Sequence, residues 1–262
     1  MRQVSFLCGG SIEIEQNSAQ PKSQPLTVDP LYYGTVIAFA LLTTALPAVL
    51  AQPRFLPIAQ AVALTVFLAI PLRAGYWRRA IWVMTVFLIT AFAVIASLTY
   101  WIPQQIEASI PSGFALRSDL VAWSFGVGLW PGSPQTAPFS QLVEFAGVCL
   151  GALITAGLAG NWFLVRAVDS TGFSAGLLAR TLAGPLGFLL SMPVWRALWI
   201  GGLAGSVILL SQPILSGRWS PRYYLANQRA LVLWSAILLV LGFLAGILLP
   251  SLWQSVIAAW IL

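Results

Sequence analysis

Four polar side chains within long apolar runs have the most chemical potential in this chain: Arg180, Asn161, Asp169 and Glu144. A guanidinium can bind an anion or a lipid headgroup, and a neighbouring amide or carboxylate can share its hydrogen bonds. An arginine near the middle of a membrane costs at least ~2.5 kcal/mol on insertion scales. It therefore needs a partner, water or a route to the surface. We predict a polar intramembrane site formed by these four residues.

The position of Arg180 is set by a row of small residues. Four residues recur at every fourth position: Gly172, Gly176, Arg180 and Gly184. This spacing places them on one helix face, so the guanidinium is expected among neighbouring helices. Because side chains lean toward the helix N-terminus, Arg180 is expected to reach Asn161 and Asp169 before Glu144, which belongs near the opposite membrane face.

Two interpretations of Arg180 stay open. It is either a structural residue, satisfied by carbonyls and Asn161 around a Gly184-Pro185 kink, or a cytoplasm-facing site for an anion or headgroup. The variant Arg180→Gln separates them. Unchanged folding, transport, binding and complex assembly would exclude the second interpretation.

No catalytic constellation is present in the sequence. Histidine is absent, and the seven acidic residues form no paired carboxylate, H-E-x-x-H motif, nucleophile elbow or P-loop. The two cysteines, Cys8 and Cys149, lack the spacing of a thiolate metal site. We therefore predict that the protein is not an enzyme and has no cofactor-binding or metal site.

The composition predicts an all-α, polytopic membrane protein. Apolar residues make up 59% of the chain and charged residues 8%, and apolar runs of bilayer length alternate with short charged connectors. The net charge of +6 comes mainly from arginines at the ends of these runs. That placement indicates contact with the lipid bilayer and its anionic headgroups and argues against nucleic acid as a partner.

The expected organisation is a flexible cytoplasmic tail, residues 1–30, and one transmembrane domain, residues 31–262. The predicted helices are 31–51, 55–72, 79–101, 139–165, 171–192, 195–215 and 230–249, with an outer loop at 102–138. Asp29, just before Pro30, is expected to cap the first of these helices. The segment 250–262 is either an interfacial helix or the continuation of the seventh span past the kink at Pro250.

Orientation follows from the arginines, because cytoplasmic connectors carry an excess of basic residues. The connectors 73–79 and 218–229 hold three arginines each and are expected in the cytoplasm. Nine basic residues then lie inside, including Arg2, Lys22 and Arg166, and three lie outside, namely Arg54, Arg117 and Arg196. The predicted topology is N-in and C-out, and it requires the run 171–192 to cross the bilayer fully.

Helix packing is expected to differ between the two halves. The helices within 31–101 contain almost no glycine, whereas each of the last four carries two glycines four residues apart. These pairs are Gly147 and Gly151, Gly172 and Gly176, Gly201 and Gly205, and Gly242 and Gly246. Such spacing lets helix backbones approach closely. Tight packing within one bundle is the favoured reading over a homo-oligomer interface.

Two functions are compatible with the sequence. A permease or channel-like transport protein would use the glycine-rich bundle as a pathway, with Arg180 and Asn161 lining a polar cavity. A non-catalytic subunit or assembly factor would dock a membrane-protein partner on its glycine faces. Transport is slightly favoured. The expected location is the plasma or inner membrane, with an internal energy-transducing membrane as the alternative.

Single cysteines at positions 73, 118 and 222 test the orientation. With Cys8 and Cys149 replaced, an impermeant thiol reagent should label position 118 from the opposite side to positions 73 and 222. Labelling of all three positions from one side would overturn the predicted topology.

Overall fold

The computed structural model describes residues 29–135, 138–182, 191–217 and 228–261, and within these ranges the chain is all-helical. The prediction of an all-α bundle is confirmed. The first five helices are α1 (Pro30–Val49), α2 (Phe55–Arg73), α3 (Trp77–Trp101), α4 (Pro103–Ser109) and α5 (Gly113–Ser124). The others are α6 (Pro138–Ile154), α7 (Leu158–Leu182), α9 (Val194–Ser216) and α11 (Arg229–Ile261). The tail predicted over residues 1–30 lies almost entirely outside the described residues.

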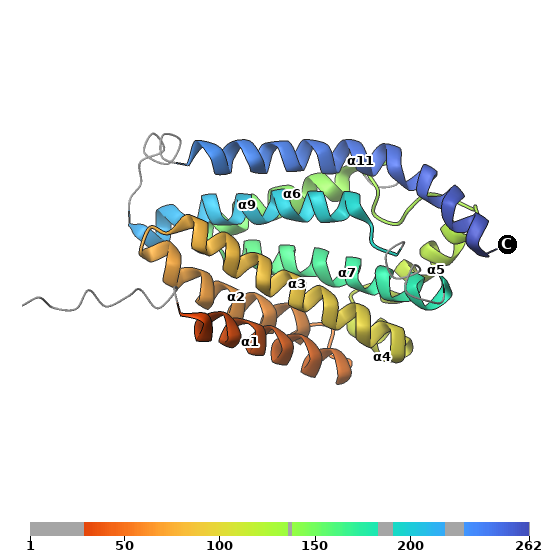
Figure 1. Cartoon of the computed structure of the whole chain (residues 1–262), viewed down its shortest axis with the longest axis horizontal. Coiled ribbons are helices and arrows are strands. Elements are labelled where there is room, and N and C mark those ends of the chain that lie inside the picture. Colours follow the sequence, from red (N-terminus) through yellow and green to blue (C-terminus); the bar gives the residue numbers. More distant parts are fainter. Residues whose placement is uncertain (1–28, 136–137, 183–190, 218–227, 262) are drawn as a thin grey trace, which may run out of the picture.

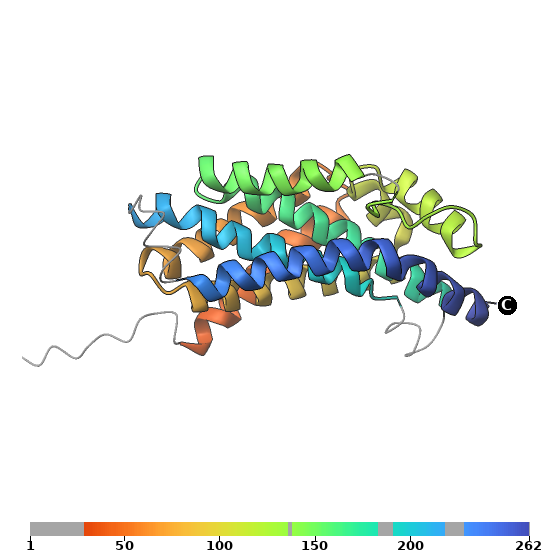
Figure 2. The ribbon, with the colours of Figure 1, turned by 90° about the horizontal axis from the view of Figure 1, so that it is seen from above.

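Seven long helices run along the bundle axis, while α4 and α5 cap one end of it (Figure 1). The start of α1 and the end of α11 lie at opposite ends of the bundle in both Figure 1 and Figure 2. The predicted N-in and C-out topology also places these two points on opposite sides. The number of membrane crossings and the end that faces the cytoplasm stay predictions.

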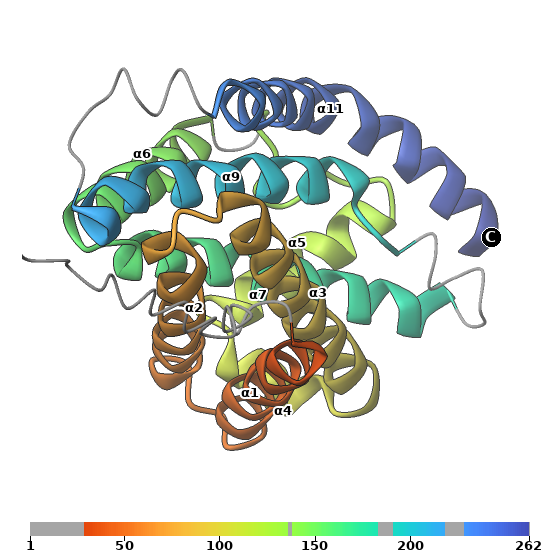
Figure 3. The same ribbon diagram turned by 60° about the vertical axis from the view of Figure 1, so that its left-hand side comes forward.

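Helix α7 occupies the centre of the bundle. It packs against α2 and α3 on one side and against α6 and α9 on the other (Figure 3). Buried side chains therefore surround most of its circumference, including Asn161, Asp169 and Phe173. This position explains how a helix with several polar residues lies inside a membrane protein, since neighbouring helices replace lipid as its environment.

Five of the described helices are long and apolar enough to cross a membrane: α1, α2, α3, α9 and α11. Helix α6 has only 17 residues, near the lower limit for a span. Helix α7 has 25 residues but carries Arg166, Asp169 and Arg180. The protein is thus a helical membrane bundle in which α7 is shielded by the other helices.

Two predicted helix boundaries are wrong. The chain turns at Thr155, Ala156 and Gly157, so the predicted helix 139–165 ends early, and α7 includes the start of the predicted helix 171–192. Ala156 and Gly157 have positive φ angles of 54° and 100°. Charges were expected to mark a connector near Arg166, but Arg166 and Asp169 both lie inside α7. The neighbouring helices make these charges compatible with the interior of α7. The chain is instead interrupted between α6 and α7 by a turn with left-handed backbone angles, which the sequence marks only weakly.

The sequence predicted how the helical region begins, but it left open how that region ends. Asp29 was expected to cap the first helix, and its carboxylate accepts a hydrogen bond from the Leu31 amide at 2.9 Å, which confirms that cap. At the other end, α11 continues through Pro250 to Ile261 as one helix. Its 33 residues correspond to about 50 Å, longer than the ~30 Å hydrocarbon core. Gln254 anchors the extension by donating to the Trp123 carbonyl of α5 at 2.6 Å.

The paired glycines lie at close helix contacts. A Cβ on Gly176 would lie 2.5 Å from the Ala96 carbonyl of α3, and a Cβ on Gly242 would lie 2.5 Å from the Trp199 amide of α9. A Cβ on Gly151 would meet the Gly160 amide at 2.8 Å. Gly201 differs, because a Cβ there would only touch the tip of Leu238 at 3.4 Å. Close backbone approach therefore joins α3 to α7, α6 to α7 and α9 to α11.

Gly176→Ala should lower the free energy of unfolding by about 1–3 kcal/mol, because the added methyl group collides with the α3 backbone. Gly34→Ala is the matched control, since nothing lies within 4 Å of its added Cβ. Thermal unfolding in detergent micelles measures both. Equal midpoints for the two variants would contradict the close contact between α3 and α7.

Candidate functional site

A buried hydrogen-bonded chain links α1, α2 and α7. The side-chain amide of Gln60 donates to the Thr44 hydroxyl at 3.0 Å and to the Asp169 carboxylate at 2.9 Å. All three side chains are buried, with exposed fractions of 0% for Thr44 and Gln60 and 3% for Asp169. An isolated carboxylate would be costly here, so the Gln60 contact is what makes Asp169 compatible with the core.

A second polar contact lies two turns earlier on α7. The amide of Asn161 donates to the Thr65 hydroxyl of α2 at 2.8 Å. Among the described residues, Gln60 Oε1 and Asn161 Oδ1 are buried without a hydrogen-bond partner. Because α2 and α7 are antiparallel, these two contacts lie along the same interface. The two hydrogen bonds join α2 and α7 at two levels along this interface. The carbonyl oxygens of the Gln60 and Asn161 side chains can each accept a further hydrogen bond.

Arg180 does not join this interface. It lies in the last turn of α7 and its side chain is exposed. The prediction that it projects among helices beside Asn161 and Asp169 is therefore wrong. Its helix starts at Leu158, which places Arg180 at the bundle end that α5 covers. Arg180 therefore lies near that end of α7, away from Asn161 and Asp169. Gly184 and Pro185, the expected kink, lie outside the described residues.

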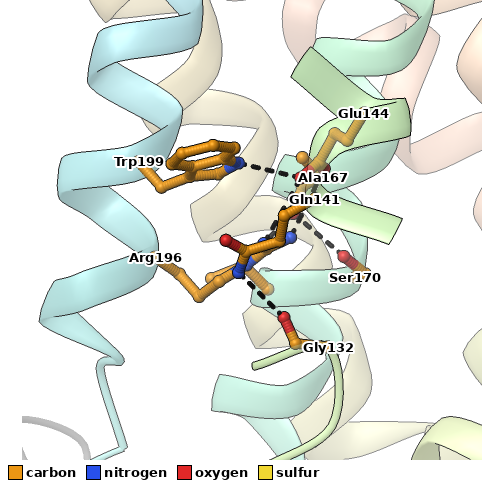
Figure 4. A network of polar contacts seen from close by, with 8 residues as sticks. Gly132, Gln141, Glu144, Ala167, Ser170, Arg196 and Trp199 are labelled. Atoms are coloured by element: carbon orange, nitrogen blue, oxygen red, sulfur yellow. Dashed lines mark hydrogen bonds and ion pairs between the residues drawn. The ribbon is translucent and has the colours of Figure 1, made fainter. Parts of the chain in front are cut away.

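Glu144 belongs to a different cluster, between α6 and α9 (Figure 4). Its carboxylate accepts a hydrogen bond from Trp199 Nε1 at 2.8 Å and faces both terminal nitrogens of Arg196 at 3.5 Å. The side chains of Arg196 and Glu144 are only 12% and 18% exposed. The structure thus brings Asn161 and Asp169 to the α2–α7 interface, with Glu144 and Arg180 elsewhere.

Sequence reasoning missed the partners of Glu144. Arg196 was expected only as a basic residue outside the membrane, yet its three-residue spacing from Trp199 places both on one face of α9. That spacing was the available signal. Arg166 was also expected in a connector, but its guanidinium lies 4.7 Å from the centre of the Trp162 ring, one turn earlier on α7. Both arginines are held by aromatic or acidic side chains inside the bundle.

An apolar groove of about 690 Å³ lies between α3, α9 and α11, with α7 at its base. We call it the lateral groove. Its lining from α3 and α7 is Trp77, Ile81, Met84, Thr85, Leu88, Ile89, Phe92, Val168 and Thr171. From α9 and α11 it is lined mainly by Val194, Ala197, Ile200, Gly201, Ala204, Gly205, Ile208, Leu231, Trp234, Ser235 and Leu238.

The lateral groove offers little to a polar ligand. Among its described lining residues none is charged. The hydroxyls of Thr171 and Ser235 donate to carbonyls of their own helices, at 2.6 and 2.7 Å. Ile89 and Trp234 at the rims are each 63% exposed, so the groove opens toward the surroundings of the bundle. In a membrane those surroundings are lipid, and hydrocarbon is the chemistry that this lining matches.

The groove also runs along helix α3. Trp77 and Phe92 line it fifteen residues apart on one helix, a rise of about 22 Å. That is most of the ~30 Å hydrocarbon core. Sequence reasoning did not find this groove. The four-residue spacing of Ala197 and Gly201 was the available signal for it, because small side chains at these lining positions leave room on that face of α9.

No protein-family model, curated protein or solved structure matches this chain. In the described part of the chain, no three His, Cys, Asp or Glu residues lie close enough to hold a metal ion. The function is therefore argued from the geometry of the bundle.

Asp169→Leu should lower the free energy of unfolding by about 1–3 kcal/mol, because the Gln60 amide loses a buried acceptor. Asp169→Asn keeps a side-chain oxygen at that position and should cost less. Denaturation in mixed micelles compares the two. If the leucine variant were as stable as the wild type, the α2–α7 hydrogen bond would contribute nothing to the fold.

Proposed function

We propose that this membrane protein binds the hydrocarbon chain of a lipid or related amphiphile in the lateral groove. The observation that carries the proposal is the groove itself. It has a volume of about 690 Å³, its described lining is predominantly apolar and carries no charge, and it is open at the side. This proposal restricts the transport hypothesis to molecules with a hydrocarbon chain. Such a molecule would enter the groove sideways from the bilayer, and the polar pathway past Arg180 that the sequence suggested would not be needed.

The shape of the groove supports a chain-like ligand. The lining residues Trp77 and Phe92 lie about 22 Å apart along α3, so the groove is elongated along the helix axis. An extended hydrocarbon chain matches this elongated apolar shape. It would restore dispersion contacts that an empty groove forfeits.

A second candidate function is that of a non-catalytic membrane subunit. Ala197, Gly201 and Gly205 line the groove at four-residue spacing, and small residues are typical of helix contacts in membranes. A partner's helix could then lie along the open side with its side chains in the groove. This candidate is the weaker one, because Ser235 of α11 already packs against Gly205 and covers part of this row.

Ala197→Phe should remove bound lipid, because the new ring would project into the groove from the exposed Ala197 position. Ala236→Phe is the matched control, since Ala236 is also exposed but lies outside the groove lining. Lipid per protein is measured by native mass spectrometry after extensive detergent exchange. We expect about one retained lipid in the wild type and the control, and at least a fivefold loss in Ala197→Phe.

Equal lipid retention by both variants would contradict the proposed site. Retention of a stoichiometric membrane-protein partner by the wild type, lost in Ala197→Phe and kept in Ala236→Phe, would favour the subunit function instead. Size-exclusion profiles and thermal midpoints verify that both variants fold.

A further inference from the structure

We infer that the bound lipid carries an anionic headgroup, held at the end of the lateral groove where α3 and α11 begin. This inference rests on the proposed lipid-binding function and assigns the class of lipid. It follows from the distribution of charge around the two ends of the groove.

One end of the groove is flanked by arginines. Trp77, the first residue of α3, lines the groove, and the exposed guanidinium of Arg78 lies 5.4 Å from the centre of its ring. On the facing helix, Leu231 lines the groove and Arg229 is exposed two residues earlier, at the start of α11. Two cationic side chains thus lie beside the lining residues at this end.

Further arginines near this end of the groove add to its positive charge. Arg73 ends α2, and Arg79 stacks on the Tyr76 ring at 4.6 Å. The one described acid at this end of the bundle is Asp29, and its carboxylate is occupied in capping α1. Among the described residues the local charge is therefore strongly positive, which is complementary to an anionic lipid headgroup.

The opposite end of the groove lacks a comparable pair among the described residues. Met192, Pro193 and Val194 line it there. The nearby Arg196 faces Glu144 on α6. Arg180 lies nine residues after the lining residue Thr171, about two and a half turns, so it points away from the groove. The hydrocarbon chain would therefore lie along α3 and α9 with its headgroup at the Arg78 and Arg229 end.

The chemistry of the arginines fits a phosphate-bearing headgroup. A guanidinium presents a fork of donors that matches phosphate oxygens, and Trp77 suits the boundary between hydrocarbon and headgroup. An arginine near the membrane surface contributes about fivefold to the binding of an anionic lipid. Two such residues are expected to give a preference of about 25-fold over a zwitterionic lipid.

The test uses the full chain, delipidated in detergent and offered equal amounts of phosphatidylglycerol and phosphatidylcholine with matched acyl chains. Native mass spectrometry measures the ratio of the two bound lipids. The wild type is expected to prefer phosphatidylglycerol at least tenfold. The double variant Arg78→Gln with Arg229→Gln should lose most of that preference but still bind lipid, because the groove is intact.

The matched control is Arg54→Gln with Arg180→Gln, which removes two exposed arginines from the other end of the bundle. It should keep the wild-type preference. Lipid bound without headgroup preference, or a preference lost equally in both double variants, would overturn the inference while leaving the proposed function intact. If no lipid were retained by the wild type, the proposed function and the inference would both fail. All four altered side chains are exposed, and thermal midpoints verify folding.

Discussion

The bundle depends on the burial of one polar helix by its neighbours. Helix α7 carries Asn161 and Asp169 on the side that meets α2, where Thr65 and Gln60 hydrogen-bond to them. Lipid offers no such partners, and an unpaired polar group in hydrocarbon costs several kcal/mol. The other helices must therefore surround α7, and their arrangement around it determines which surfaces face lipid.

The two sides of α7 are packed by different means. Toward α3 and α6, glycines bring the backbones together, as Gly176 does against Ala96, so dispersion contacts dominate. Toward α2, hydrogen bonds set the register. On α9 the row of small residues is unevenly covered by α11, because a Cβ on Gly205 would collide with Ser235, whereas one on Gly201 would only touch the tip of Leu238 at 3.4 Å. The lateral groove is a consequence of this uneven coverage.

Charge in this protein is placed at the ends of the bundle or is neutralised within it. Glu144 and Arg196 face each other across α6 and α9, and Arg166 stacks on Trp162. Arg78 and Arg229 are exposed at the ends of the helices that border the groove. A ligand with a long apolar chain and an anionic end matches both properties of this region, which links the groove to the charge distribution of the bundle.

The sequence by itself determined the class of helical membrane bundle, because hydropathy and backbone hydrogen bonding in lipid leave few alternatives. It also predicted the cap at Asp29, a local interaction. Tertiary structure alone decided that the chain breaks at Gly157 instead of near Arg166, that Arg180 reaches an exposed end, and that Glu144 meets Arg196. The physical reason is that neighbouring helices, and not lipid, surround α7, so its polar residues no longer mark a membrane boundary.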